Sequence, residues 1–314
     1  MSEGEFQIID RFFTHSSFGA WKSQGIGDDC ALIDTGVERI AVTTDMMAIG
    51  THFLPSCAPE NVGYKALAVN LSDLAAAGAT PRAFFLSIGL PDRDDAWLAK
   101  FSQGMMALAR ETGCALLGGD TTRTAEVADK RAPVTISITA MGSLPAGKGI
   151  TRTGARPGDD IWVSGTPGDA YAGLKIAWGH WTARVELGEA LLDIASAAAD
   201  ISDGLLADLG HILERSDVGA DLVWDAMPRS EALMMLTEAQ QQEAALSGGD
   251  DYELIFTAPR EARERIEQLS RATSLRISRI GKIRARDSSN NLILRTDAGI
   301  VIATPTPGFN HFAN

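Results

Sequence analysis

Apolar residues along the chain follow two spacings, one typical of strands and one typical of helices. Short apolar runs bounded by turn residues predict strands, whereas apolar residues three or four positions apart predict helices. In the first half, the predicted order is helix 3–14, strands 31–33 and 39–44, helix 59–78, strand 82–90, helix 94–112, a short buried strand 114–117 and strand 133–142. Strands and helices are therefore mixed rather than segregated.

The second half shows the same mixture. Its predicted order is strand 160–164, helices 167–179, 186–199 and 204–215, strand 219–224, helix 237–246, strand 252–257, helix 260–271 and strands 275–281, 291–295 and 299–303. Strands that alternate with helices in both halves predict an α/β (α+β) architecture.

A segment rich in turn residues separates the halves. Residues 143–158 contain four glycines and two prolines, a composition typical of connections between folded units. We therefore predict one domain over 1–145 and a second over 150–314. A length of 314 residues gives two such domains ample core.

Composition narrows the class of protein. The chain is 45% apolar and 22% charged, as in globular proteins, and its net charge of −13 argues against nucleic acid as a partner. Three cysteines without CxxC spacing do not predict a disulfide framework or a zinc site. The acidic segment 1–5 lacks an apolar signal core, and no run is long enough to span a membrane, so we expect a cytoplasmic protein.

Aspartates recur at turns and strand ends. They occur in Gly25-Ile26-Gly27-Asp28-Asp29, Thr43-Thr44-Asp45, Ser72-Asp73, Gly118-Gly119-Asp120, Asp200-Ile201-Ser202-Asp203 and Gly248-Gly249-Asp250-Asp251. Each segment alone is typical of a surface turn or a helix cap. Together, their carboxylate and hydroxyl oxygens suit Mg²⁺ or Mn²⁺, which bridge carboxylates to phosphates. The set predicts metal-assisted phosphoryl transfer.

Some of these residues allow two interpretations. Asp73 lies near the C-terminal end of a predicted helix, where a negative charge is unfavourable unless a cation compensates it. Asp200 and Asp203 are equally compatible with helix capping and with metal binding. Arg152 is either a surface charge or a phosphate clamp. No GxxxxGK[ST] loop is present, so a nucleotide would not be held by that device.

Eight segments in order resemble thiamine-monophosphate kinase. They are Gly-Ile-Gly-Asp-Asp-Cys-Ala-Leu at 25–32, Thr-Thr-Asp at 43–45, His-Phe-Leu-Pro at 52–55, Tyr-Lys-Ala-Leu-Ala-Val-Asn-Leu-Ser-Asp-Leu-Ala-Ala at 64–76, Gly-Gly-Asp-Thr-Thr-Arg at 118–123, Ile-Ser-Asp-Gly-Leu at 201–205, Ser-Gly-Gly-Asp-Asp-Tyr-Glu-Leu at 247–254 and Gly-Phe-Asn-His-Phe at 308–312. The resemblance implies the two-domain fold of the aminoimidazole-ribonucleotide synthetase group. It also implies a homodimer whose N-terminal domains pair into a barrel, with ATP at their interface.

The resemblance further implies a reaction and a set of site residues. ATP would phosphorylate thiamine monophosphate to thiamine diphosphate, with several Mg²⁺ ions held by Asp29, Thr43, Thr44, Asp45, Asp73, Asp120, Asp200 and Asp203. Gly119, Asp120, Arg152 and Ser202 would contact ATP, and His52, Asp250 and Phe309 would contact thiamine monophosphate. Phe309 stands where Tyr or Trp is expected, and Asp250 where some relatives have Glu.

Two other functions remain open. The first is another ATP-dependent synthetase of the same superfamily; selenophosphate synthesis is disfavoured, because no cysteine lies in a glycine-rich N-terminal loop. The second is a thiamine-phosphate-binding protein without catalytic activity. The many aspartates argue against it, because binding alone does not need several metal ions.

Overall fold

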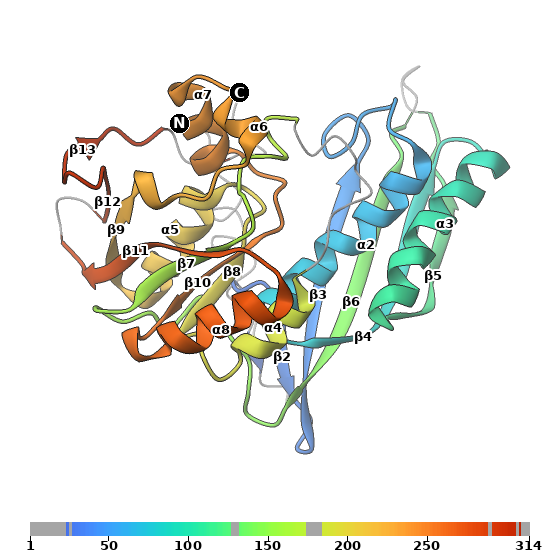
Figure 1. Ribbon diagram of the computed structural model, residues 1–314. Helices are drawn as coiled ribbons and strands as arrows, with labels where there is room; N and C mark the ends of the chain where they lie inside the picture. Colours follow the sequence, from blue (N-terminus) through green and yellow to red (C-terminus); the bar gives the residue numbers. More distant parts are fainter. Residues whose placement is uncertain are drawn as a thin grey trace.

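The chain forms two β-sheets that lie side by side in the computed structural model, each with its own helices (Figure 1). The structure describes residues 23–24, 27–126, 132–173, 184–287, 291–305 and 308. The predicted helix 3–14 lies outside this part of the chain. Within it, none of the helices combines the length and apolarity needed to cross a bilayer.

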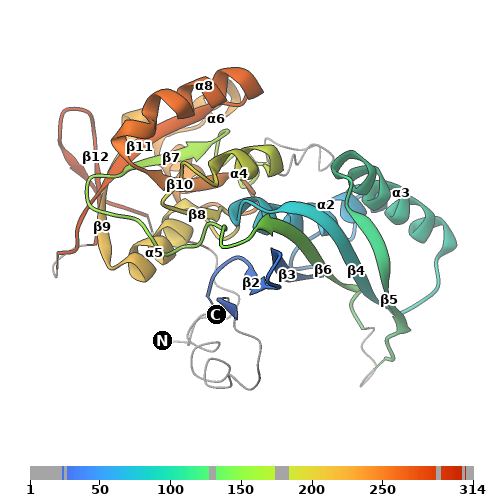
Figure 2. The same cartoon turned by 90° about the horizontal axis from the view of Figure 1, so that it is seen from below.

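The first sheet has six strands in the order β1-β2-β3-β6-β4-β5. Neighbouring strands are antiparallel except β4 and β5, which are parallel. Helices α2 (Pro59–Ala76) and α3 (Asp95–Thr112) cover one face and enclose an apolar core with it (Figure 2). The strands are β1 (Ser23–Gln24), β2 (Ala31–Asp34), β3 (Glu38–Ala48), β4 (Thr80–Leu90), β5 (Ala115–Arg123) and β6 (Thr135–Pro145).

The second sheet has seven strands in the order β13-β12-β9-β11-β7-β10-β8. Its strands are β7 (Asp160–Ser164), β8 (Ala197–Asp200), β9 (Val218–Val223), β10 (Leu254–Ala258), β11 (Ile277–Ala285), β12 (Leu292–Arg295) and β13 (Val301–Ile302). Its helices are α4 (Val185–Leu191), α5 (Leu205–Ser216), α6 (Glu231–Met234), α7 (Glu238–Gln242) and α8 (Arg263–Thr273). One π-helical turn, η2 (Glu243–Ser247), follows α7, and two short 3-10 turns are η1 (Trp224–Ala226) and η3 (Arg260–Ala262).

Helices cover both faces of the second sheet. In β7, Ile161 and Val163 point to the core beneath α5, whereas Trp162 points to the core beneath α4 and α8. Alternate residues of a strand point to opposite faces, so a strand covered on both sides is apolar throughout. This explains why β7, β8 and β10 are buried along their whole length.

Helix α2 belongs to both halves. Most of it packs on the first sheet, but Ala75 and Ala76 join the core that contains Trp162 and α4. The backbones of α2 and α4 approach closely at Gly188, where a Cβ atom would lie 2.0 Å from the carbonyl oxygen of Ala75. The two sheets are therefore held against each other by one continuous helix.

Three predicted elements differ in the structure. Residues 186–199 form helix α4 only to Leu191, and 197–200 form strand β8, because this small-residue run is fully buried beside β10 and pairs with it. The predicted buried strand 114–117 is β5, which continues to Arg123 and is exposed along its whole length. Residues 167–173 form turns, and the remainder of the predicted helix 167–179 lies outside the described residues.

Candidate active site

A cavity of about 1720 Å³ lies between the two halves. Strand β3 and helix α2 line one side, and the loops before α5 and β10 line the other. Sites for one small molecule usually measure about 300–1,000 Å³, so this cavity has room for two substrates.

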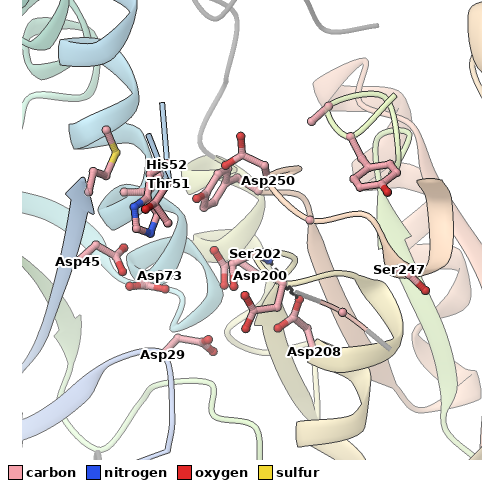
Figure 3. Close-up of a pocket in the computed structure, with 18 of the residues that line it drawn as sticks. Asp29, Asp45, Thr51, His52, Asp73, Asp200, Ser202, Asp208, Ser247 and Asp250 are labelled. Atoms are coloured by element: carbon pink, nitrogen blue, oxygen red, sulfur yellow. Dashed lines mark hydrogen bonds between the residues drawn. The ribbon is translucent and has the colours of Figure 1, made fainter. Parts of the chain in front are cut away.

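Three carboxylates meet in this cavity. One carboxylate oxygen from each of Asp29, Asp73 and Asp200 lies within 4.8 Å of the others. Asp29 precedes β2, Asp73 is in the last turn of α2, and Asp200 ends β8. Figure 3 shows that these side chains and Asp45 point toward one another. The grouping suits a hard divalent cation, which takes carboxylate oxygens as ligands.

The carboxylates repel one another electrostatically. Burial raises the pKa of Asp73 well above its usual range, and the charges of Asp45 and Asp200 raise it further. Burial also raises the pKa of Asp200, as does the charge of Asp29. The pKa of Asp29 is raised by burial too, although Arg152 opposes the shift. Such a cluster binds cations well, because a cation removes the repulsion.

Strand β3 is fixed against α2 by polar contacts. The Thr43 hydroxyl donates to the Asp73 carboxylate, and the Asp45 backbone N–H donates to Asn70 Oδ1 at 3.1 Å. The Thr44 side chain instead donates to the Ile138 carbonyl of β6 at 3.1 Å. Asp45 lies inside β3 rather than after its end, since the strand continues three residues beyond it to Ala48.

The loop before α5 is organised by a buried aspartate that the sequence patterns did not single out. Asp208 Oδ2 accepts backbone N–H groups from Ser202, Asp203 and Gly204 at 3.1, 3.2 and 3.1 Å. Ser202 and Asp203 both line the cavity. A pattern search would have found Asp208 only as a carboxylate in the first turn of a helix, where it is common.

Arg152 is a buried residue, not a surface charge. Its guanidinium lies 2.6 Å from Asp29 Oδ1, and its backbone N–H donates to Asp28 Oδ1 at 2.8 Å. The two adjacent aspartates are thus used differently: Asp28 holds the backbone of Arg152, and Asp29 pairs with its side chain. The guanidinium brings a fixed positive charge to the carboxylate cluster, as anion binding requires.

A second polar group lies around Asp250. Lys65 Nζ, buried on α2, lies 2.6 Å from the Asp250 carboxylate and 2.9 Å from the His52 carbonyl oxygen. Burial lowers the pKa of Lys65, and the Asp250 charge opposes that shift. His52 Nδ1 accepts the Ala48 N–H at 3.0 Å, so a neutral His52 carries its proton on Nε2. Lys65, to which no sequence motif points, connects His52 with Asp250.

Two predicted site residues, Gly119 and Asp120, do not join this group within one chain. Gly119 and Asp120 lie on the exposed edge strand β5, and neither lines the cavity. Across the sheet, Asp120 of β5 pairs with Ser87 of β4, and Ser87 pairs with Ser137 of β6. Ser137 in turn pairs with Met46 of β3, the residue after Asp45. Three strand spacings amount to about 14 Å, too far for shared metal binding. Phe309 lies outside the described residues, although Gly308 lines the cavity.

Comparisons with known proteins match the whole described fold. The family model for the AIR synthase related protein N-terminal domain matches residues 27–144, and that for the C-terminal domain matches 156–291. Thiamine-monophosphate kinase of Salmonella typhimurium is 40% identical over 334 aligned positions, which cover 100% of this chain and 99% of the relative. The chain belongs to the thiamine-monophosphate kinase family.

Solved structures of the family agree with this assignment. Thiamine-monophosphate kinase from Stenotrophomonas maltophilia K279a has a TM-score of 0.76 and 38% identity, covering 94% of this chain and 96% of its own. AaThiL complexed with AMPPCP and TMP has a TM-score of 0.82 and 31% identity, covering 98% and 97%. The mixed α/β two-domain fold expected from the sequence is thus confirmed, as is the family.

Proposed function

We propose that this chain transfers the terminal phosphoryl group of ATP to thiamine monophosphate, forming thiamine diphosphate and ADP. The observation that carries the proposal is the trio Asp29, Asp73 and Asp200, whose carboxylates meet in a cavity with room for two substrates. Membership of the thiamine-monophosphate kinase family supports it, as does the AaThiL structure with AMPPCP and TMP. Because ATP is the donor, the reaction belongs in the cytoplasm.

The donor set fits Mg²⁺, which prefers carboxylate and hydroxyl oxygens. Asp29, Asp73 and Asp200 would hold the ions, with further oxygens from Thr43, Thr44, Asp45 and Asp203 of the same chain and from Asp120 of the partner subunit. When bound, the ions neutralise the charge of two phosphate compounds brought side by side. Arg152 and Ser202 would contact ATP, together with Gly119 of the partner subunit and Asp120 of the partner subunit.

The acceptor needs no general base. A phosphate monoester is already ionised near neutral pH, so the attacking oxygen has no proton that an enzyme side chain must remove. His52, Asp250 and Phe309 would orient the acceptor, and Lys65 fixes the first two through its contacts at 2.9 and 2.6 Å. We therefore infer direct in-line transfer from ATP to the acceptor, without a phosphorylated enzyme side chain.

Pairing of two chains would complete the site. Strand β5 is an exposed edge, and the sheet face away from α2 and α3 exposes Met46 and Phe85. Unpaired edges and exposed apolar faces are typical of surfaces that another chain covers. In the homodimer we propose, residues 1–145 form the ATP-binding and pairing domain, residues 150–314 form the second domain, and Asp120 reaches the partner's cavity.

A coupled assay of ADP release tests the function. With thiamine monophosphate, ATP and Mg²⁺, we expect ADP and thiamine diphosphate in equal amounts, and no turnover with excess chelator. Asp73→Asn and Asp120→Asn should each abolish turnover while far-UV circular dichroism and dimerisation remain unchanged. Retained activity in both variants would contradict the proposed site.

Three further measurements separate the alternatives. Turnover with formylglycinamidine ribonucleotide in place of thiamine monophosphate would indicate a sister synthetase. Tight thiamine monophosphate binding in calorimetry without any diphosphate product would indicate a binding protein. Labelled phosphate trapped on an Asp or His side chain during rapid quench would contradict in-line transfer.

A further inference from the structure

The cavity is also lined by Tyr252, a residue with no role in the site assigned so far. Its backbone lies just before β10 in the second half of the chain, yet its side chain packs against the apolar core of the first sheet. Tyr252 therefore connects the two halves where they enclose the cavity. Asp250, two residues earlier, also lines the cavity, and Figure 3 shows it apart from Asp45 and Asp73.

The backbone of this turn has an unusual conformation. Asp250 and Tyr252 have φ angles of +69° and +50°, in the left-handed region. Aspartate tolerates this region, whereas a bulky aromatic residue rarely adopts it, because the conformation costs stability. Residues in such conformations persist where their surroundings hold them, and they cluster at active sites. The conformation of Tyr252 in a cavity wall therefore indicates a role in the site.

The neighbouring loop holds the turn in this conformation. The Asp250 N–H donates to the Ser202 carbonyl oxygen at 2.8 Å. The Tyr252 N–H donates to the Ile201 carbonyl oxygen at 2.9 Å. A Cβ atom at Gly249 would lie 2.3 Å from the Ser202 carbonyl oxygen, so only glycine allows this close approach. The turn that carries Asp250 and the loop that carries Ser202 therefore form one unit.

The side chain between Asp250 and Tyr252 serves a different purpose. Asp251 is 2% exposed and does not line the cavity. Its carboxylate accepts the Gly168 N–H at 2.7 Å and the Ala170 N–H at 3.3 Å, and so anchors another loop of the second half. The turn thus directs Asp250 and Tyr252 into the cavity, while Asp251 fixes the turn from behind.

The phenol of Tyr252 contacts the Asp250 carboxylate. Burial raises the pKa of Tyr252 well above its usual range, and the Asp250 charge raises it further, so the hydroxyl keeps its proton and donates it in a hydrogen bond to Asp250. Lys65 Nζ lies 2.6 Å from both oxygens of the same carboxylate. The Asp250 side chain is nevertheless 38% exposed. The carboxylate is therefore held by two donors and still open to a ligand in the cavity.

We propose that Tyr252 is a positioning residue for the acceptor: its hydroxyl fixes the Asp250 carboxylate in the orientation in which Asp250 contacts thiamine monophosphate. This inference rests on the proposed function, in which Asp250 orients that substrate. Lys65 also donates to this carboxylate, but an ammonium group is a compact point charge with rotatable donors. The hydroxyl of Tyr252 is carried by a rigid ring and adds a donor at a fixed place.

Steady-state kinetics and calorimetry test this role with a variant that lacks one oxygen atom. In Tyr252→Phe, which keeps the ring and its packing, we expect the KM and the Kd for thiamine monophosphate to rise about tenfold, because a hydrogen bond to a charged group is lost. The KM for ATP should change less than twofold. A structural defect in the turn would instead disturb the Ser202 loop and raise both KM values. The matched control is Tyr64→Phe, at a tyrosine that packs on the same core outside the cavity wall.

A double-mutant cycle shows whether Tyr252 acts through Asp250. Asp250→Gly removes the carboxylate and accommodates the φ angle of +69°. In this background, Tyr252→Phe should change the Kd for thiamine monophosphate less than twofold, because the effects of coupled residues are not additive. A further tenfold rise would contradict positioning through Asp250, as would an unchanged Kd in Tyr252→Phe alone.

The two measurements together separate this inference from the proposed function. If Tyr252→Phe weakens binding of thiamine monophosphate tenfold, yet the wild type forms no thiamine diphosphate, the positioning role stands and the proposed function fails. If the wild type forms thiamine diphosphate and Tyr252→Phe has the same KM for thiamine monophosphate, the proposed function stands and the positioning role fails.

Discussion

Without a cation, the folded state loses free energy of stabilisation by holding Asp29, Asp73 and Asp200 close together. Each loses hydration, and each stands within the field of the other two. Arg152 pairs with Asp29, whereas Asp73 and Asp200 receive only hydroxyl hydrogens from Thr43 and Ser72, and these neutral donors do not cancel the negative charges. At the scale of single residues, the cluster therefore lowers the stability of the folded chain, and a bound cation would restore it.

Stability without metal should depend on pH in a definite direction. The pKa of Asp200 is raised to about 8, whereas an unfolded aspartate has a value near 4. The folded chain therefore keeps protons that the unfolded chain releases, and this stabilisation is complete below about pH 4 and disappears as pH rises to about 8. Each such proton contributes a slope of about −1.4 kcal/mol per pH unit to the free energy of unfolding.

Urea denaturation from pH 5 to pH 8, with chelator and with Mg²⁺, measures this effect. We expect the stabilisation by Mg²⁺ to grow with pH, because the ions bind the ionised carboxylates. Asp73→Asn, which removes one charge, should flatten the slope measured with chelator. A Mg²⁺ effect that is the same at every pH would contradict the cluster as the binding site.

Asp208 offers a second test at a single residue. Asp208→Ala leaves the N–H groups of Ser202, Asp203 and Gly204 without their acceptor. We expect a loss of about 2–3 kcal/mol in the free energy of unfolding, together with weaker ATP binding. Asp208→Asn keeps an oxygen that accepts hydrogen bonds and should lose less. Equal stability of the alanine variant and the wild type would show that the loop does not need this carboxylate.

The elements differ in how far sequence patterns can predict them. Helix α3 is bounded by local chemistry: the Asp94 side chain accepts the Trp97 N–H at 3.0 Å, and Gly113 ends the helix at φ +67°. Its predicted limits, 94–112, are therefore almost those observed. Strand β8 has no such local signals, because its alanines favour a helix and only the pairing with β10 makes them a strand.

Close helix contacts provide a test at this scale. Gly188→Ala places a methyl group against the Ala75 carbonyl at the α2–α4 contact, and we expect a loss of about 1–3 kcal/mol in the free energy of unfolding. Gly210→Ala in α5 is the matched control. A Cβ atom at Gly210 meets nothing within 4 Å, so this variant should gain up to about 1 kcal/mol from helix propensity. Thermal denaturation of both variants gives the sign of each change.

At the scale of the whole molecule, the site combines segments that are distant in the sequence. The aspartate motifs predicted Asp29, Asp73 and Asp200 as candidates, but spacing alone does not show that positions 29 and 200 meet. Lys65 and Asp208 were missed because a lysine or an aspartate on a helix is usually solvent-exposed. Asp120 was grouped with the others by its motif, whereas within one chain β5 lies on the far edge of the sheet.

Mixed dimers would test whether Asp120 acts across chains. Asp73→Asn and Asp120→Asn should each be inactive alone. When they are unfolded and refolded together, half of the dimers contain one chain of each kind, and each of these has one intact site. We therefore expect about a quarter of wild-type activity from the mixture. No recovery, although mixed dimers are seen by native mass spectrometry, would contradict a shared site.

Helix α2 carries Lys65, which contacts Asp250 and His52, and Asp73, which belongs to the carboxylate cluster. They are eight positions apart in the helix, a rise of about 12 Å set by backbone hydrogen bonds. The helix therefore fixes the distance between these two positions of the cavity wall. Inserting a single residue between these positions would turn one of them by about 100° out of the cavity. Side chains between Lys65 and Asp73 can therefore change during evolution, but the number of residues between them cannot.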